Sequence, residues 1–262
     1  MSKLIRPILL EVCVASVDDA IAAQSGGAGR LEINAALALG GLTPSLGTLV
    51  EVKRAVQVPV VAMLRPRPGG FAYSDGDFEV MRRDLDLLLA HGAGAIVFGI
   101  LREDGTVDER RCGALRRQMG EVPAVFHRAF DVTARPLEAL EQLIALGFRR
   151  VLTSGQQTTA LQGAALITEL VHLAAGRIEI LPGGGVNRLT ARDLITQTGC
   201  NQVHGSLRCT RTDSSTMARP NVFFGASRQR EDQYDTTDQS AVAQLCELFQ
   251  EIADGHNEIG SS

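Results

Sequence analysis

Several residue types that define other classes of protein are missing from this 262-residue chain or scarce in it. Tryptophan is absent and aromatic residues make up only 4% of the sequence, so the core must consist of aliphatic side chains. No apolar run reaches the roughly 18 residues that a membrane span needs, and Met1–Pro7 lacks the apolar stretch of a signal peptide. We therefore expect a cytoplasmic protein that does not enter a membrane.

The chain also has little net charge and no local cysteine motif. Its 26 basic and 30 acidic residues give a net charge of −4 without a basic block, so nothing indicates binding to nucleic acid or to an anionic membrane. The five cysteines are scattered and include no CxxC pair. This argues against a disulfide framework and against a zinc or iron–sulfur site formed by neighbouring residues.

Short apolar runs alternate along the chain with longer amphipathic runs. The expected strands are Ile8–Val14, Arg30–Asn34, Pro59–Leu64, Ala95–Gly99, Ala124–His127, Arg150–Ser154, Arg177–Leu181 and Gln202–Ser206. The expected helices are Ser16–Gln24, Ser45–Val56, Asp77–His91, Asp108–Met119, Pro136–Leu146, Ala160–Ala174, Arg188–Thr198 and Gln239–Ala253.

Eight such units of about 30 residues, each with an apolar strand, predict an α/β fold with buried parallel strands. We expect a closed (β/α)8 barrel of the TIM type, in a single domain over residues 1–262. The alternative is an open doubly wound sheet. That fold usually has a glycine fingerprint after its first strand, and Cys13–Ser16 contains none.

One segment, at about residues 208–239, does not fit the repeat. It is polar, its five arginines balance five acidic residues, and it is too long for an ordinary loop between strand and helix. Two interpretations remain open: a mobile insertion before the last helix, or an arm that reaches a neighbouring subunit with Phe223 and Phe224 as its apolar anchor. The second interpretation agrees with a homo-oligomer.

Polar residues gather at the C-terminal ends of the expected strands, where a barrel of this type carries its site. Glu11 and Cys13 end the first strand, and Glu32 with Asn34 ends the second. Residues two apart on a strand share a face, so these side chains continue the inward-facing rows. An aliphatic core has no packing use for such groups, and their coupled titration predicts an acid or base with a shifted pKa. The candidate catalytic residues are Glu11, Glu32, Arg65, His127 and Asp131.

Arg65 and Arg67 flank the stiff turn Arg65-Pro-Arg-Pro-Gly-Gly70. This turn could hold a planar guanidinium group ready for a carboxylate or phosphate. The alternative is that both arginines only neutralise Glu11 and Glu32 in a network of salt bridges.

In the second half of the chain, the strand ends offer backbone groups rather than charge. Glycines let backbone N–H groups approach an anion, and the loops after strands seven and eight hold phosphate in many such barrels. The alternative is that these glycines only make tight turns. The candidate substrate-binding residues are Arg67, Ser154, Gly155, Gly183, Gly184, Gly185, His204 and Ser206.

A metal site is a further possibility at the same end of the barrel. Copper(I) prefers thiolate and thioether ligands, which makes the inward-facing Cys13 and Met63 the candidate ligands. Carboxylates together with a histidine would instead suit a harder divalent ion.

Several specific strings resemble the copper homeostasis protein CutC family, in the family's order from about residue 8 to 208. They are Glu11-Val-Cys-Val-Ala-Ser-Val17, Gly27-Ala-Gly-Arg-Leu-Glu-Ile33, Gly40-Gly-Leu-Thr-Pro-Ser45, Met63-Leu-Arg-Pro-Arg67, Phe71-Ala-Tyr-Ser74, Val97-Phe-Gly99, Phe126-His-Arg-Ala-Phe-Asp131, Leu152-Thr-Ser-Gly155, Pro182-Gly-Gly-Gly185 and His204-Gly-Ser206. The resemblance implies a TIM-type barrel, a cytoplasmic dimer or tetramer, and a role in copper homeostasis with copper(I) binding.

The chain departs from the family pattern at two positions. Many relatives have cysteine where this chain has Asn34, and some have cysteine after the histidine where this chain has Gly205. Cys13 is therefore the one motif cysteine left on the inner face.

Three hypotheses follow: a copper homeostasis protein that binds copper(I), a barrel enzyme for a small anionic or phosphorylated metabolite without copper, and a scaffold with a vestigial site. Whether the chain is an enzyme stays open.

Overall fold

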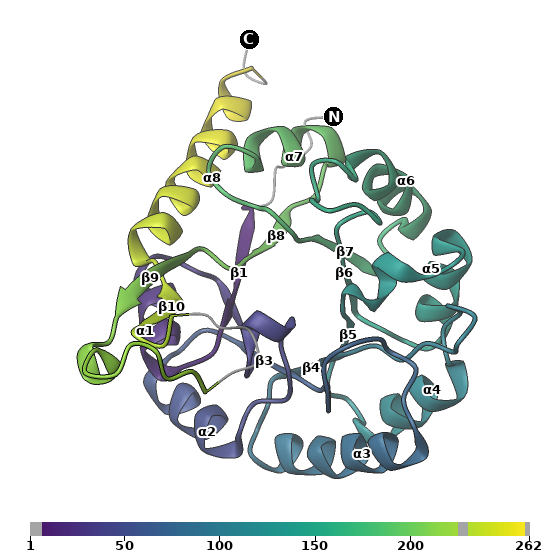
Figure 1. Ribbon diagram of the computed structural model, residues 1–262. Helices are drawn as coiled ribbons and strands as arrows, with labels where there is room; N and C mark the ends of the chain where they lie inside the picture. Colours follow the sequence, from purple (N-terminus) through teal and green to yellow (C-terminus); the bar gives the residue numbers. More distant parts are fainter. Residues whose placement is uncertain (1–6, 225–229, 260–262) are drawn as a thin grey trace.

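The computed structural model describes residues 7–224 and 230–259, and its central feature is a ring of parallel strands surrounded by helices (Figure 1). The strands occur in the spatial order β7-β6-β5-β4-β3-β2-β1-β8, so β1 pairs with both β2 and β8. A parallel bridge between Gly183 and His204 joins the ends of β7 and β8 and closes the ring. The strands are β1 (Leu9–Val14), β2 (Arg30–Ile33), β3 (Val60–Met63), β4 (Ala95–Phe98), β5 (Ala124–Phe126), β6 (Arg150–Thr153), β7 (Glu179–Pro182) and β8 (Gln202–Gly205).

An α-helix follows each barrel strand, directly or after a loop, as the alternation in the sequence predicts. Serine hydroxyls start three of the helices: Ser16, Ser45 and Ser74 each accept a hydrogen bond from a backbone N–H of the first turn. Within the described ranges no helix combines the length and the apolar character that crossing a bilayer requires. The helices are α1 (Val17–Ser25), α2 (Leu46–Ala55), α3 (Asp75–Ala90), α4 (Glu109–Gln118), α5 (Pro136–Ala145), α6 (Ala164–Ala174), α7 (Ala191–Thr198) and α8 (Gln239–Ile259). The fold is therefore a (β/α)8 barrel, as expected.

The apolar core has two parts. The larger part lies between the strands and the helices, where outward-facing strand residues such as Leu10, Val12 and Ile96 are fully buried. The smaller part lies inside the barrel on β3, β4 and β5 and consists of five residues: Val61, Met63, Ala95, Val97 and Val125. The buried charged side chains of the interior, Glu11, Arg30, Glu32, Arg150 and His204 among them, come from the other strands.

The segment after β8 contains two strands that the sequence analysis did not foresee. β9 (Arg208–Thr212) and β10 (Gln233–Thr237) form an antiparallel ribbon beside α1, at the rim of the barrel (Figure 1). A short 3-10 turn, η3 (Ser214–Thr216), follows β9. The Phe224 side chain is 79% exposed, while residues 225–229 of the arm lie outside the described residues. Association of this arm with another subunit stays a prediction.

Candidate functional site

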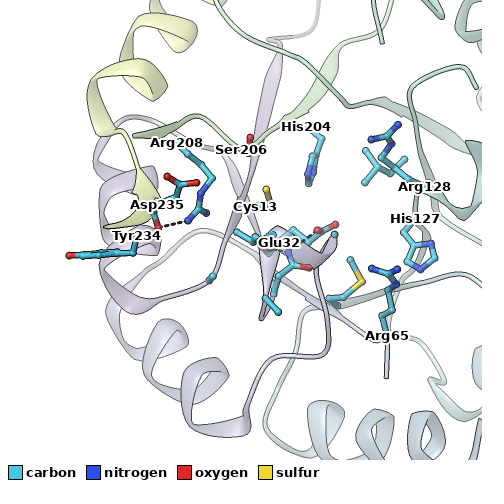
Figure 2. A pocket seen from close by; sticks show the side chains of 18 of the residues that line it. Cys13, Glu32, Arg65, His127, Arg128, His204, Ser206, Arg208, Tyr234 and Asp235 are labelled. Atoms are coloured by element: carbon cyan, nitrogen blue, oxygen red, sulfur yellow. Dashed lines mark hydrogen bonds between the residues drawn. The ribbon is translucent and has the colours of Figure 1, made fainter. Parts of the chain in front are cut away.

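A cavity of about 740 Å³ opens at the C-terminal ends of the barrel strands, and the β9–β10 ribbon forms part of its wall. Figure 2 shows Arg208, Tyr234 and Asp235 from the ribbon on one side and Arg65, His127 and Arg128 on the other. Cys13 and Glu32 lie between these two walls (Figure 2). The predicted site residues that the cavity brings together are Cys13, Glu32, Met63, Arg65, His127, His204 and Ser206.

Glu11 lies beneath the cavity rather than in its lining, and both oxygens of its carboxylate are engaged. His204 Nδ1 donates to Glu11 Oε1 at 2.8 Å, and Arg30 Nε donates to Glu11 Oε2. Although burial alone would raise it, the hydrogen bond from His204 and the charge of Arg30 lower the pKa of Glu11 to about 2. Glu11 is therefore a carboxylate that holds His204 in place from below.

His204 stands between two carboxyl groups and a thiol. Burial alone would lower its pKa, but the Glu32 carboxyl and the contacts with Cys13 and Glu11 raise the pKa of His204 well above the usual value. Ligand atoms of Glu11, Glu32 and His204 all lie within 4.8 Å of one another. This group has the donors for a hard divalent ion, and His204 could offer it Nε2 only after losing the proton that its surroundings favour.

Glu32 and Asn34 form a second polar pair at the end of β2. Asn34 Nδ2 donates to Glu32 Oε1 at 3.0 Å, and both residues are buried in the cavity wall. Burial raises the pKa of Glu32. The Asn34 amide therefore orients the neighbouring carboxyl group.

A layer of charged residues below Glu11 fills the lower interior of the barrel, and the sequence analysis did not single it out. Arg30 Nη2 donates to Gln202 Oε1 at 2.9 Å, and Arg150 pairs with Glu179 at 2.7 Å. These residues begin β2, β8, β6 and β7, on the same inward-facing rows as the site residues above them. The alternation of inward-facing residues, followed back to the first residue of each strand, would have predicted that these side chains also lie inside the barrel.

Arg65 is held by the backbone rather than by Glu11 or Glu32. Its Nη1 donates to the carbonyls of Leu39 and Gly41, and its Nη2 donates to the carbonyl of Gly69 at 2.8 Å. Among the described residues no carboxylate forms an ion pair with it. The alternative in which this arginine neutralises the two glutamates is therefore wrong.

His127 directly follows β5 and lies at the same wall. Gly99 gives it room, because a Cβ there would lie 2.7 Å from His127 Cε1 and Nδ1. Burial, together with the nearby charge of Arg65, lowers the pKa of His127 to about 3. The imidazole is therefore neutral at physiological pH.

Arg67 does not reach the cavity. Its Nε donates to Asp77 Oδ2 at 2.9 Å and its Nη2 donates to the carbonyl of Ala72 at 2.8 Å, which ties the turn to the start of α3. This placement does not support the expectation that Arg67 binds a ligand beside Arg65. The alternative, in which Arg67 neutralises Glu11 or Glu32, is also wrong, because its carboxylate partner is Asp77.

Asp131 and Ser154 also lie outside the cavity lining. Asp131 belongs to the 3-10 turn η2 (Arg128–Val132) and accepts hydrogen bonds from the Ser154 amide at 2.9 Å and from Thr153 Oγ1 at 2.5 Å. These bonds fix the turn after β5 to the end of β6. They also orient Arg128, whose Nε donates to Asp131 at 2.7 Å and which does line the cavity.

The four candidate glycines surround the rim without lining the cavity. Gly155 has a φ of +66°, and a Cβ there would lie 2.3 Å from the Gly163 carbonyl oxygen, so the close approach of two loops requires glycine. Gly183 forms the bridge to β8, and Gly184 and Gly185 follow it with positive φ. Their tight turns have a structural use, and an additional role in binding an anion stays a prediction.

The arm supplies lining residues that the sequence analysis left unassigned, among them Arg208, Arg230 and Tyr234. Arg208 is the first residue of β9, three residues after β8 ends at Gly205. Tyr234 lies on β10, and its pairing with Arg211 of β9 brings it to the rim, while Arg230 lies in the segment before β10.

Residues 8–209 match the model of the CutC family. The chain belongs to the CutC family. A CutC family protein of Treponema denticola is 46% identical to it over 247 residues, which cover 94% of this chain and 98% of the relative. The human copper homeostasis protein cutC homolog is 45% identical over 219 residues, which cover 84% of this chain and 80% of the relative.

Solved structures agree with this assignment. A crystal structure of a CutC protein from Streptococcus agalactiae matches with a TM-score of 0.73 and 33% identity, over 76% of this chain and 98% of that one. Thiamine phosphate pyrophosphorylase from Pyrococcus furiosus matches with a TM-score of 0.58 at 14% identity, over 95% of this chain and 99% of that one. This second likeness extends to the barrel fold alone. The family model covers β1 to β8 and ends within β9, whereas the match to the Treponema denticola relative extends into residues 208–239.

Proposed function

We propose that this CutC family member serves copper homeostasis and that its cavity holds copper(I) as cargo. The observation that carries the proposal is that a thiol and a thioether line the same cavity: Cys13 from β1 and Met63 from β3. Thiolate and thioether sulfur are the donors that copper(I) prefers. Cys13 and Met63 therefore suit copper(I) better than the carboxylates and imidazole of Glu11, Glu32 and His204 do.

The other cysteines support the assignment of Cys13. Cys112 and Cys200 are buried outside the barrel interior, and burial raises their pKa values to about 12 and about 11. A buried thiol in apolar surroundings is inert as a ligand, since metals bind the thiolate. Cys13, in contrast, lies beside the cavity with His204 next to it as a borderline nitrogen donor.

Binding of copper(I) must release protons. The Cys13 thiol loses its proton on coordination, and His204 would have to give up a proton that its surroundings hold firmly. We therefore assign the ion to Cys13 and Met63 and expect affinity to increase with pH.

The test is an anaerobic titration of the purified protein with copper(I) against a strong chelator. Cys13→Ser should weaken binding by at least about 100-fold, and Met63→Leu by about tenfold, because each removes one soft ligand. Cys209→Ser is the matched control, since Cys209 lies on β9 and does not line the cavity. Equal affinity of wild type and Cys13→Ser would contradict the proposal.

A further inference from the structure

Buried polar atoms without a hydrogen-bond partner gather around the cavity. Within the described part of the chain, eight buried side-chain nitrogen or oxygen atoms have no partner. Four of them belong to residues that line the cavity: Asn34 Oδ1, Arg65 Nε, His127 Nε2 and Arg208 Nη1. Leaving such an atom unpaired costs about 1–3 kcal/mol, so native proteins seldom do so without a water or ligand partner. Their concentration at one place indicates a polar ligand.

His127 is a hydrogen-bond donor with no acceptor in the protein. The backbone N–H of Ala129 donates to His127 Nδ1 at 3.1 Å, so Nδ1 is an acceptor. A neutral imidazole that accepts at Nδ1 carries its proton on Nε2. The side chain is only 4% exposed, so this Nε2–H group is fixed at the cavity wall and unpaired.

Arg65, at the same wall, carries a positive charge that no described carboxylate neutralises through an ion pair. Three backbone carbonyls fix its guanidinium group, and these take three of its five N–H groups. The Phe71 ring contacts both residues: Arg65 Cζ lies 5.2 Å from its centroid, and the His127 ring lies 4.9 Å away. An apolar ring at this point excludes water and strengthens the attraction of Arg65 for an anion.

We infer that Arg65 and His127 form a subsite for the oxyanion group, a carboxylate or a phosphate, of a small organic molecule. Arg65 supplies the charge and His127 supplies a directional N–H donor, while Arg128 adds a second guanidinium at the rim. A volume of about 740 Å³ is that of a small-metabolite site. Glu32, which lies between the two walls (Figure 2), and the unpaired Asn34 Oδ1 beside it accept hydrogen bonds, so the ligand also carries a hydroxyl or amino group.

Calorimetric titration with inorganic phosphate and, separately, with malonate tests the subsite. The wild type should bind at least one of the two anions at millimolar or lower concentration, and the tighter one identifies the group. Arg65→Gln should weaken binding by at least about tenfold and His127→Phe by about threefold, because each removes a buried donor. Arg67→Gln is the matched control, a guanidinium two residues away and outside the cavity, and should bind like wild type. Absence of binding by wild type, or equal binding by Arg65→Gln, would overturn the inference.

A second measurement needs no substitution in the wall. In the ¹⁵N spectrum of imidazole side chains, His127 should show the neutral form protonated at Nε2 at pH 7, and its Nε2 signal should shift on saturation with the anion. An unchanged Nε2 signal would overturn the inference even if a surface site bound phosphate. Copper(I) affinity of Arg65→Gln should equal that of wild type, so failure of the anion subsite is distinguishable from failure of copper binding.

Discussion

Buried charges inside the barrel depend on one another at the residue scale. Glu11 joins the cavity to the charged layer below it, because one carboxylate oxygen binds His204 and the other binds Arg30. A buried ion pair adds little net stability, but removing one partner leaves the other charge uncompensated in a medium of low dielectric constant. Glu11 is thus the residue whose neutralisation disturbs both the site and the interior.

Glu11→Gln keeps the size of the side chain and removes its charge. We expect the free energy of unfolding, measured by urea denaturation at pH 7, to fall by about 3–5 kcal/mol, since Arg30 loses its buried counter-charge. Glu141→Gln is the control, because its ion pair with Arg177 lies on the surface and should matter little. A loss for Glu11→Gln no larger than that of the control would show that the interior tolerates an unpaired Arg30.

At the scale of elements, the β9–β10 ribbon is attached to the barrel through α1. Asp19 accepts hydrogen bonds from Thr236 Oγ1 at 2.7 Å and from the Thr237 amide at 2.6 Å, and these bonds together lower the pKa of its carboxyl group although burial opposes them. The same carboxylate accepts from the Ala15 amide at the start of α1. One buried side chain thus connects β10 to the helix that follows β1 and keeps the ribbon at the cavity.

Asp19→Ala should release the ribbon while leaving the barrel folded. We expect trypsin to cleave at the arginines of residues 208–230 several times faster than in wild type, with unchanged far-UV circular dichroism. Asp18→Ala is the control, since Asp18 lies exposed one residue earlier on the same helix. Equal cleavage rates for wild type and Asp19→Ala would show that other contacts hold the ribbon.

Stability of the whole molecule should depend on pH through His127. Its pKa is about 3 in the folded protein and about 6.5 in the unfolded chain, so the unfolded state binds more protons below pH 6.5. The contribution of neutral His127 to the free energy of unfolding is therefore fully present above pH 6.5 and is lost as the pH falls toward 3. His204, Glu32 and Glu11 also titrate differently in the two states, so the dependence on His127 is isolated by comparison with a variant that retains all three.

Urea denaturation between pH 6.5 and pH 5 measures this dependence. As the pH falls from 6.5 to 5, the free energy of unfolding should decrease in both proteins or in wild type alone, and the decrease should be steeper for wild type than for His127→Phe. The difference between the two slopes should be up to about 1.4 kcal/mol per pH unit. Parallel curves for the two proteins would mean that His127 is protonated in the folded state, which would also remove it as a neutral donor.

Local patterning in the sequence determined the barrel, the order of its elements and the part of the cavity lining that the barrel strands supply. Apolar runs of strand length, amphipathic runs of helix length and serine caps act within a few residues, so they are readable without coordinates. The period of two in a strand likewise placed Cys13, Glu32, Met63 and His204 inside, because parity depends on the strand alone. The motif strings then gave the family.

The tertiary structure decided which polar groups are partners and which are free. Arg65 and Arg67 are alike in sequence, yet backbone carbonyls from two loops hold Arg65 at the cavity and Asp77 draws Arg67 away. The pairing of Glu11 with Arg30 and His204, and the folding of the arm into a ribbon over the rim, likewise join residues 19 to 218 positions apart. Such contacts depend on how strands and loops meet in space, and hydrogen-bond partners over that range leave no local pattern in the sequence.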